Sequence, residues 1–324
     1  MIADDGEPSD LPRAALALRA RLLAEMGPEA IALRRLHPGR RALEVGTFVA
    51  LWGAGAWLAL SGWGTAALVG GILLSAIALN AFMLLTHEGH HGLLARTPWV
   101  NRVATLALAL PLLHSPTAYR ALHTRHHRHL GEDGDPDDYH NYAKTTRGLW
   151  LMHWMRLTVG PILYIFAIPA AAWRVSRRAD RRRVLADYAV LLAVYAGLAW
   201  FVPWQVLVVA WLAPLLPVGY FTALRGLAQH GLTDRKDPHL AARTFRANRV
   251  VAFCLLHENH HLEHHLFPDV PSYHLPRLHA LMWPHMPRAI LGRSYVGFLV
   301  AFVRRSLRMD GSPLGVTRLG GAGG

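Results

Sequence analysis

The stretch His257-Glu258-Asn259-His260-His261-Leu262-Glu263-His264-His265-Leu266-Phe267-Pro268 holds the densest group of histidines in the chain. Five of the nine residues from 257 to 265 are histidine. Histidine is the commonest side-chain metal ligand, and rings clustered only for packing would each need partners for two nitrogens. Glu, Asn and Leu lie between the histidines, and the stretch is well inside the chain. Both features argue against an affinity tag. The pattern predicts a metal site.

Two earlier segments carry similar histidine boxes. Box one is His87-Glu88-Gly89-His90-His91, whose first and last rings, at positions i and i+4, share one helical face. Box two is His123-Thr124-Arg125-His126-His127, and box three is His261-Leu262-Glu263-His264-His265. Both of these read H-x-x-H-H. One such box is a weak signal, but three in order are a strong one.

The three boxes offer more rings than a single ion can bind. Two rings from box one and three from each of the other boxes make eight, and His230, which follows the last long apolar run, makes nine, about right for two ions with four or five ligands each. The single cysteine, Cys254, excludes an iron–sulfur cluster or a thiolate zinc site within the chain. Imidazole suits zinc, copper, iron or nickel. A pair of metal ions at a membrane surface, within reach of lipid tails, favours redox chemistry on hydrocarbon. Zinc cannot carry out redox chemistry.

The composition is typical of a multi-span membrane protein. Hydrophobic residues make up 52% of the 324 residues and charged residues only 17%. The net charge is +13, and the basic residues fall in loops beside the apolar runs. The positive-inside rule and anionic lipid headgroups explain these residues better than binding to nucleic acid does. We therefore expect a membrane as a partner and no nucleic acid.

Two long charge-free runs predict four transmembrane helices in two hairpins. The first run covers 42 residues, about twice the ~20 needed to cross a bilayer, and the second covers 37. Turns are expected at 61–65 and near Pro203. The predicted helices are Val45–Leu60, Ala66–Leu85, Val184–Val202 and Trp204–Leu224. The expected fold class is all-α integral membrane, with a histidine-rich di-metal site.

The distribution of basic residues predicts the orientation. The N-terminal region, the loop with Arg174–Arg183 and the C-terminal tail are basic, whereas both turns within the hairpins carry no Lys or Arg. This alternation places both termini in the cytoplasm. All three boxes and His230 then fall on the cytoplasmic face, so the active site is expected there.

The remaining segments complete the expected organisation. Ala14–Leu23 predicts a short amphipathic helix, and no cleaved signal peptide is evident. Val100–Leu113 and Leu157–Trp173 are too short for full spans and predict interfacial or re-entrant helices. Gly320–Gly324 is expected to be disordered. We divide the chain into a cytosolic N-terminal region (1–40), a membrane domain with the boxes (41–290) and a cytosolic tail (291–324).

The order and spacing of the boxes resemble the membrane fatty acid desaturase superfamily, with the pattern H-x(3,4)-H, H-x(2,3)-H-H and [HQ]-x(2,3)-H-H. The flanks agree: Asp135-Pro136-Asp137 follows box two, and Pro271-Ser272-Tyr273-His274-Leu275-Pro276 follows box three. The resemblance covers residues 45 to 285. It implies four transmembrane helices, a cytosolic helical cap and a di-iron centre. The implied ligands are His87, His91, His123, His126, His127, His230, His261, His264 and His265.

This sequence departs from the family pattern in box one. Glu88 stands where Asp is usual, and His90 stands where a small residue is usual. We expect His90, His257 and His260 to lie around the ligands or at the surface rather than to bind metal. Asn259 is a candidate for holding a metal-bound water.

The resemblance implies an O2-dependent desaturase that forms a double bond in a fatty acyl or lipid chain at two iron ions, with O2 as co-substrate. The chain carries no flavin, haem or iron–sulfur domain, so electrons are expected from a ferredoxin, a b5-like protein or a reductase. The alternative is a hydroxylase or ketolase of the same scaffold acting on a carotenoid, alkane or acyl chain. The box geometry does not separate these outcomes.

Three rival interpretations are weaker. Box one and His257–His261 match the H-E-x-x-H motif of zinc proteases, but that chemistry leaves boxes two and three without a role. A metal transporter predicts polar residues within the spans, and Asn80 is the only strongly polar one in the first hairpin. Asp135–Asp138 could bind a cation, but turn chemistry favours a structural loop.

Overall fold

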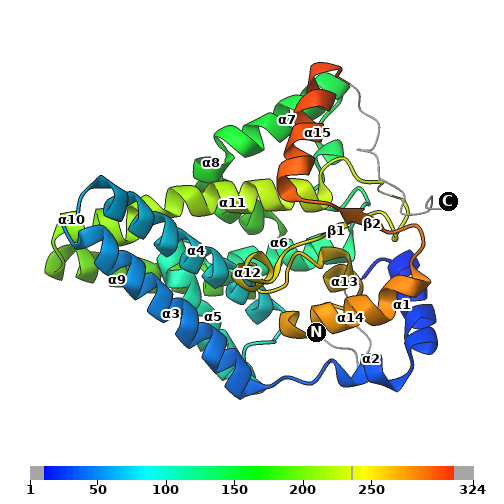
Figure 1. Cartoon of the computed structure of the whole chain (residues 1–324), viewed down its shortest axis with the longest axis horizontal. Coiled ribbons are helices and arrows are strands. Elements are labelled where there is room, and N and C mark those ends of the chain that lie inside the picture. The colour runs from blue at the N-terminus through cyan, green and yellow to red at the C-terminus, as the bar shows by residue number, and fades with distance from the viewer. Residues whose placement is uncertain (1–10, 235, 310–324) are drawn as a thin grey trace. The chain divides into compact units, whose positions relative to one another are not determined.

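The computed structural model describes residues 11–234 and 236–309, which are mostly helical (Figure 1). The predicted disorder at Gly320–Gly324 lies outside these residues. The longer helices are α1 (Arg13–Met26), α3 (Pro38–Leu60), α4 (Thr65–His90), α5 (Pro98–Ala109), α6 (Pro116–Arg128), α7 (Thr146–Thr158), α8 (Gly160–Val175), α9 (Arg178–Phe201), α11 (Ala213–His230), α14 (Leu275–Met282) and α15 (Tyr295–Leu307).

Shorter elements connect these helices. They are α2 (Pro28–Ala32), η1 (Leu110–Leu112), η2 (Tyr139–Asn141), α10 (Trp204–Leu207), the π-helical turn η3 (Val208–Leu212), α12 (Arg249–Cys254), α13 (His261–Leu266), η4 (Ser272–His274) and η5 (Trp283–His285). Two strands, β1 (Arg243–Phe245) and β2 (Ile290–Gly292), pair in parallel with Arg243 opposite Ile290. The helical class is confirmed, but the all-α prediction missed this small sheet, because three-residue strands are too short to show a sequence period.

The chain divides into two compact units. Among the described residues, unit 1 contains 11–35, 123–158, 223–234 and 236–309, and unit 2 contains 36–122 and 159–222.

Four helical stretches, belonging wholly or largely to unit 2, are long and apolar enough to cross a membrane. They are Pro38–Leu60, Thr65–His90, Arg178–Phe201 and Trp204–His230, and a fifth is possible if α7 and α8 count as one interrupted span. All four predicted spans are therefore present. Each extends beyond its predicted bounds on at least one side, because helices continue past the apolar run into polar residues at the membrane surface.

Small residues bring α3 and α4 into close antiparallel contact. A Cβ atom built at Gly71 would lie 2.4 Å from the backbone nitrogen of Ala59. One built at Gly55 would lie 2.5 Å from the hydroxyl oxygen of Ser75. Only glycine allows these backbones to approach so closely, which is the usual way for helices to pack where no hydrophobic effect drives association.

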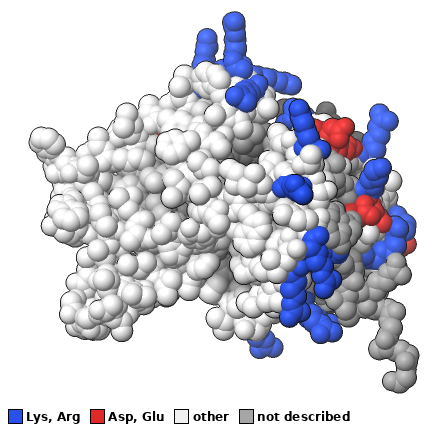
Figure 2. All heavy atoms as spheres, turned by 90° about the horizontal axis from the view of Figure 1, so that it is seen from above, with Lys and Arg blue, Asp and Glu red and all other residues white. Residues whose placement is uncertain are grey.

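The other faces of unit 2 are apolar and exposed. In α3, only 17% of the apolar stretch that could cross a membrane is buried within the protein, and the same fraction is buried in α9. On α9, Leu192, Trp200 and Phe201 are 70%, 83% and 82% exposed. Figure 2 shows a broad area without charged side chains, while Lys and Arg gather elsewhere on the same face. Such extensive apolar exposure is typical of helices solvated by lipid rather than water.

In unit 1, α1 packs on the segment that carries box three. Leu18 and Leu22 of α1 join Leu262, Phe267 and other residues in one buried cluster. Arg19 is fully buried and donates hydrogen bonds to the Leu266 carbonyl and the Asp269 carboxylate. The amphipathic helix predicted at Ala14–Leu23 is thus present, slightly longer, and its apolar face covers α13 and α14.

A second cluster in unit 1 joins α7 and α15. Trp150 of α7 and Phe298 and Phe302 of α15 pack with Leu227 near the end of α11. This places α15, from the C-terminal part of the chain, in contact with the helix that ends at His230.

Candidate metal centre

Box one occupies the C-terminal end of α4 in unit 2. His87 is buried, and its ring centroid lies 5.2 Å from that of His91. The i and i+4 spacing therefore places both rings on one face, as the sequence predicts. Between them, the fully buried Glu88 forms an ion pair with Arg41 of α3, which also binds Glu44 at 2.7 Å. A carboxylate held by a buried guanidinium is a poor base for activating water, which argues against the protease reading of H-E-x-x-H.

In unit 1, three rings from α11 and α13 converge nitrogen to nitrogen. The Nε2 atom of His230 lies 2.8 Å from Nε2 of His261 and 3.2 Å from Nε2 of His265. The Nε2 atoms of His261 and His265 are 3.2 Å apart. The ring of His126 lies beside them, with its centroid 4.7 Å from that of His230 and 5.0 Å from that of His265. We call His126, His230, His261 and His265 the first ring group.

The spacing of these nitrogens fits a shared metal ion. Ligand nitrogens about 2.1 Å from an ion and at right angles to one another are ~3.0 Å apart. The three observed separations of 2.8, 3.2 and 3.2 Å surround this value. Neutral rings bind metal, and burial together with the neighbouring rings of His127 and His261 holds the pKa of His265 well below its usual value. The donor set therefore fits an ion that prefers imidazole.

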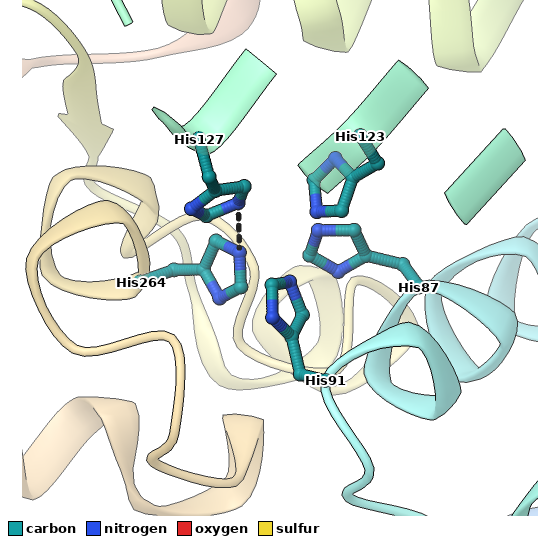
Figure 3. A group of neighbouring side chains, drawn as sticks. All are labelled: His87, His91, His123, His127 and His264. Atoms are coloured by element: carbon teal, nitrogen blue, oxygen red, sulfur yellow. Dashed lines mark hydrogen bonds between the residues drawn. The ribbon is translucent and has the colours of Figure 1, made fainter. Parts of the chain in front are cut away.

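Three further rings of unit 1 form the second ring group: His123, His127 and His264. Figure 3 shows the rings of His127 and His264 pointing toward each other, with their Nε2 atoms 3.3 Å apart. The centroid of His123 lies 4.5 Å from that of His127. All three side chains are buried. Figure 3 also labels His87 and His91, which project from α4.

Both H-x-x-H-H boxes divide their rings between the two groups. In box two, the i and i+4 residues His123 and His127 belong to the second group, while His126 belongs to the first. In box three, His261 and His265 have ring centroids 4.6 Å apart and belong to the first group, while His264 belongs to the second. Consecutive helical residues point about 100° apart, so each box contributes to both groups.

Asp135 orients the His126 ring. The ring donates from Nδ1 to the buried Asp135 carboxylate at 2.8 Å, and this carboxylate also accepts from the Asp137 backbone N–H at 2.9 Å. Burial alone would lower the pKa of His126, but the Asp135 carboxylate outweighs it, so this pKa is raised. The contact leaves Nε2 as the ligand atom. The sequence reading of Asp135–Asp138 as a structural loop missed this role, although its position directly after box two was the available signal.

Glu258 has a similar place beside box three. Its fully buried carboxylate lies 3.4 Å from Nδ1 of His261 and 3.9 Å from Nδ1 of His264. Gln229, one residue before His230, donates from its side chain to the Glu258 carbonyl at 2.7 Å. The carboxylate therefore faces Nδ1 of one ring in each group, an arrangement that directs Nε2 of both rings away from it.

Strand β1 connects the segments that carry the first ring group. Arg243 donates to the carbonyls of Ala228, Gly231 and Leu232 at 2.9, 2.7 and 2.7 Å, and so holds the end of α11 around His230. The next residue, Thr244, donates its hydroxyl proton to Glu263 of α13. None of these contacts has a local sequence signal.

Hydrogen bonds also connect strand β1 to the loop before box three. The Phe245 N–H donates to the Asn259 carbonyl at 2.8 Å, and the Asn259 amide donates back to the Phe245 carbonyl at 2.9 Å. Asn259 thus anchors the loop to β1, and its role in holding a metal-bound water stays a prediction. The non-glycine residues Leu256 and His257 adopt left-handed φ values of 46° and 62°, which reverse the chain after α12.

The other predicted peripheral histidines belong to neither ring group. His90 is buried in unit 2, with its ring 5.0 Å from that of Tyr119. His257 is half-buried at the chain reversal. His260 lies beside His279 of α14, with ring centroids 4.7 Å apart.

Two cavities of unit 1 reach the first ring group. One, of about 30 Å³, is lined by His126, His230, Asp135 and Arg156 among others, and is large enough for a single water. The other, of about 210 Å³, is mostly apolar and is lined by α1, by Leu262 and by His265. Ligand pockets commonly measure roughly 300–1,000 Å³, so this second cavity can hold only part of a lipid chain.

Comparison with known proteins finds desaturases among the similar chains. The chain is 25% identical over 207 residues to a sphingolipid delta(4)-desaturase of Drosophila melanogaster, covering 61% of each chain. It is 24% identical over 242 residues to an sn-1 oleoyl-lipid 12-desaturase of Anabaena variabilis, covering 63% of this chain and 65% of that one. A sphingolipid delta(4)-desaturase/C4-monooxygenase of Homo sapiens is 25% identical over 218 residues, or 64% of each chain.

The chain thus spans somewhat less than two thirds of the length of these curated relatives. The sequence model of the family described as fatty acid desaturase matches residues 65–297, which include all three boxes and His230. The resemblance inferred from the boxes is therefore confirmed, and the chain belongs to the fatty acid desaturase family.

Proposed function

We propose that this protein is an O2-dependent di-iron desaturase that introduces a double bond into a fatty acyl or other lipid chain. The observation that carries the proposal is the convergence of Nε2 atoms in the first ring group beside a second, separate group of buried rings. Two adjacent all-nitrogen sites suit two iron ions, and membership of the family supports the reaction class.

The proposed ligands divide between the two ions by ring group. His126, His230, His261 and His265 would hold one ion. His123, His127 and His264 would hold the other, and we propose that His87 and His91 of box one complete that site. When bound, the iron pair supplies the oxidising power that removes hydrogen from an unactivated methylene group. The carboxylates of Asp135 and Glu258 orient rings of both groups, while burial beside other rings lowers the pKa of His265 and so favours its neutral form.

The reaction balance requires an external donor. Removing two hydrogen atoms from a lipid while reducing one O2 to two waters consumes two further electrons and two protons. We propose that a ferredoxin, a b5-like protein or a reductase supplies the electrons. The cavity of about 30 Å³ beside His126 offers room for one water near the centre.

The exposed apolar spans support a lipid substrate. Substrate that partitions into the bilayer reaches the protein along the same surfaces that lipid solvates. We propose that both termini and the metal centre lie on the cytoplasmic side. We also propose that residues 41–290 form the membrane domain, flanked by the N-terminal region 1–40 and the C-terminal region 291–324.

Hydroxylation by the same centre is the second candidate. The name of the human relative couples a desaturase with a C4-monooxygenase, so one scaffold of this family carries both reactions. The two outcomes diverge after the first hydrogen is removed. Loss of the neighbouring hydrogen gives an alkene, and addition of oxygen gives an alcohol.

The lipid profile of an expressing host tests the proposal. We would compare the wild type with His264→Ala and with His129→Ala, a control two residues past box two whose ring contacts the exposed Glu132. A product lacking two hydrogens, present with the wild type and the control but absent with His264→Ala, is expected. A product with one added oxygen would favour the hydroxylase. Lipids unchanged by the wild type, with zinc and no iron in the purified protein, would refute the proposal.

A further inference from the structure

A third group of metal-binding side chains lies in unit 1 outside both ring groups. His260, Glu263 and His279 each offer one donor atom, and these atoms lie within 4.8 Å of one another. His260 immediately precedes α13, Glu263 lies within α13, and His279 lies on α14, the helix packed beside it (Figure 1). We call these three residues the clip site.

The Glu263 carboxylate is the centre of the clip site. It is fully buried, and one oxygen, Oε2, accepts the Thr244 hydroxyl proton. The other oxygen, Oε1, contacts Nδ1 of His279 and lies 4.0 Å from Nδ1 of His260. Both imidazoles thus direct the same type of nitrogen at one carboxylate oxygen.

A simple hydrogen bond between His279 and Glu263 does not account for His260. Its Nδ1 atom is buried and has no hydrogen-bond partner within residues 11–234 and 236–309. At 4.0 Å it is beyond hydrogen-bond length from Glu263. A buried ring nitrogen aimed at an oxygen that already has a donor is a costly arrangement. A cation among the three atoms would satisfy it and balance the buried negative charge.

We propose that His260, Glu263 and His279 bind one zinc-class divalent cation, separate from the two ions of the proposed catalytic centre. Two imidazoles and one carboxylate are an established donor set for zinc, with water in the fourth position. Ligands about 2.1 Å from a tetrahedral ion are ~3.4 Å apart, so only a small side-chain movement is needed. The His260 and His279 side chains are 14% and 23% exposed, which leaves a path for the ion and its water.

Such an ion would join α14 to the segment that carries box three. His260 and Glu263 alternate with the ring-group residues His261 and His264 along the chain. A cation fixed to α14 through His279 would therefore hold the backbone that positions those rings. The inference is independent of the reaction proposed above, because none of its three donors belongs to either ring group.

Metal analysis of the purified full chain tests the proposal. The protein would be equilibrated with Zn²⁺, passed through a desalting column, and analysed for zinc and iron in the same sample. We compare the wild type with His279→Ala and His260→Ala. The control is His285→Ala, six residues after His279, whose ring contacts the exposed Glu25 carboxylate.

We expect the wild type and His285→Ala to retain about one zinc ion per chain more than either clip-site variant. Iron should remain bound in all four proteins, because none of the replaced residues belongs to either ring group. Zinc should also raise the thermal unfolding temperature of the wild type and the control, but not of His279→Ala. Equal zinc in the wild type and His279→Ala, or a matching loss in the control, would overturn the proposal. If the protein binds no iron at all, the proposed function fails while the zinc comparison still decides the clip site.

Discussion

Replacing Arg243 with methionine should loosen the end of α11 and with it the first ring group. Arg243 is buried, and its guanidinium donates to three carbonyls that follow or surround His230 in sequence. Burial lowers the pKa of Arg243 to about 9, so the group stays charged at neutral pH. Methionine keeps much of the side-chain volume but donates no hydrogen bond.

The magnitude follows from those three contacts. A hydrogen bond from a charged group contributes about 1.5–3 kcal/mol, so the three contribute ~5–9 kcal/mol before the cost of burying the charge. Removing one partner from a buried ionic arrangement costs about 3–5 kcal/mol. We therefore expect the free energy of unfolding to fall by about 3–5 kcal/mol. The midpoint temperature of unfolding should fall by about 6–10 °C. Metal affinity should fall about 10–100-fold, which is the usual effect of removing a residue that orients a metal ligand.

Thermal unfolding in detergent and chelator competition for bound iron measure the two effects. Arg246→Met is the matched control, because Arg246 lies three residues away and is exposed. Arg243→Lys should fall between the wild type and Arg243→Met, since one ammonium group cannot span three carbonyls in the manner of a planar guanidinium. An Arg243→Met protein that unfolds and loses iron like the Arg246→Met control would refute the reasoning.

Three other substitutions or reactions probe separate contacts. Asp135→Asn should lower iron affinity about 10–100-fold by releasing the His126 ring, measured by chelator competition; wild-type retention would contradict the role of Asp135. Arg41→Met should lower the free energy of unfolding by about 3–5 kcal/mol because Glu88 is left charged and buried, whereas adding Glu88→Gln should recover part of it in thermal unfolding. Burial raises the pKa of Cys254, so alkylation of this single thiol should accelerate about tenfold per pH unit from pH 7 to 9; a plateau below pH 8 would contradict this.

Much of the architecture was predictable because its signals are local. A charge-free run of 42 residues must bury or expose an apolar surface along two helices, whatever the rest of the chain does. Box spacing likewise places His87 beside His91 and His261 beside His265 through helical geometry alone. The small β1–β2 sheet escaped prediction because its pairing joins Arg243 to Ile290 across 47 residues (290 − 243).

The sequence by itself determined the helical membrane scaffold, the family and the set of imidazoles, because periodicity and short-range spacing are written in neighbouring residues. Tertiary structure alone decided how the rings divide. His126 and His127 are adjacent in sequence, yet His126 lies with His230 and His265 while His127 faces His264. It also decided which carboxylates orient the rings and which arginine fixes the end of α11. Those contacts join residues far apart in the chain, and their partners become neighbours only when α6, α11, α13 and β1 pack together.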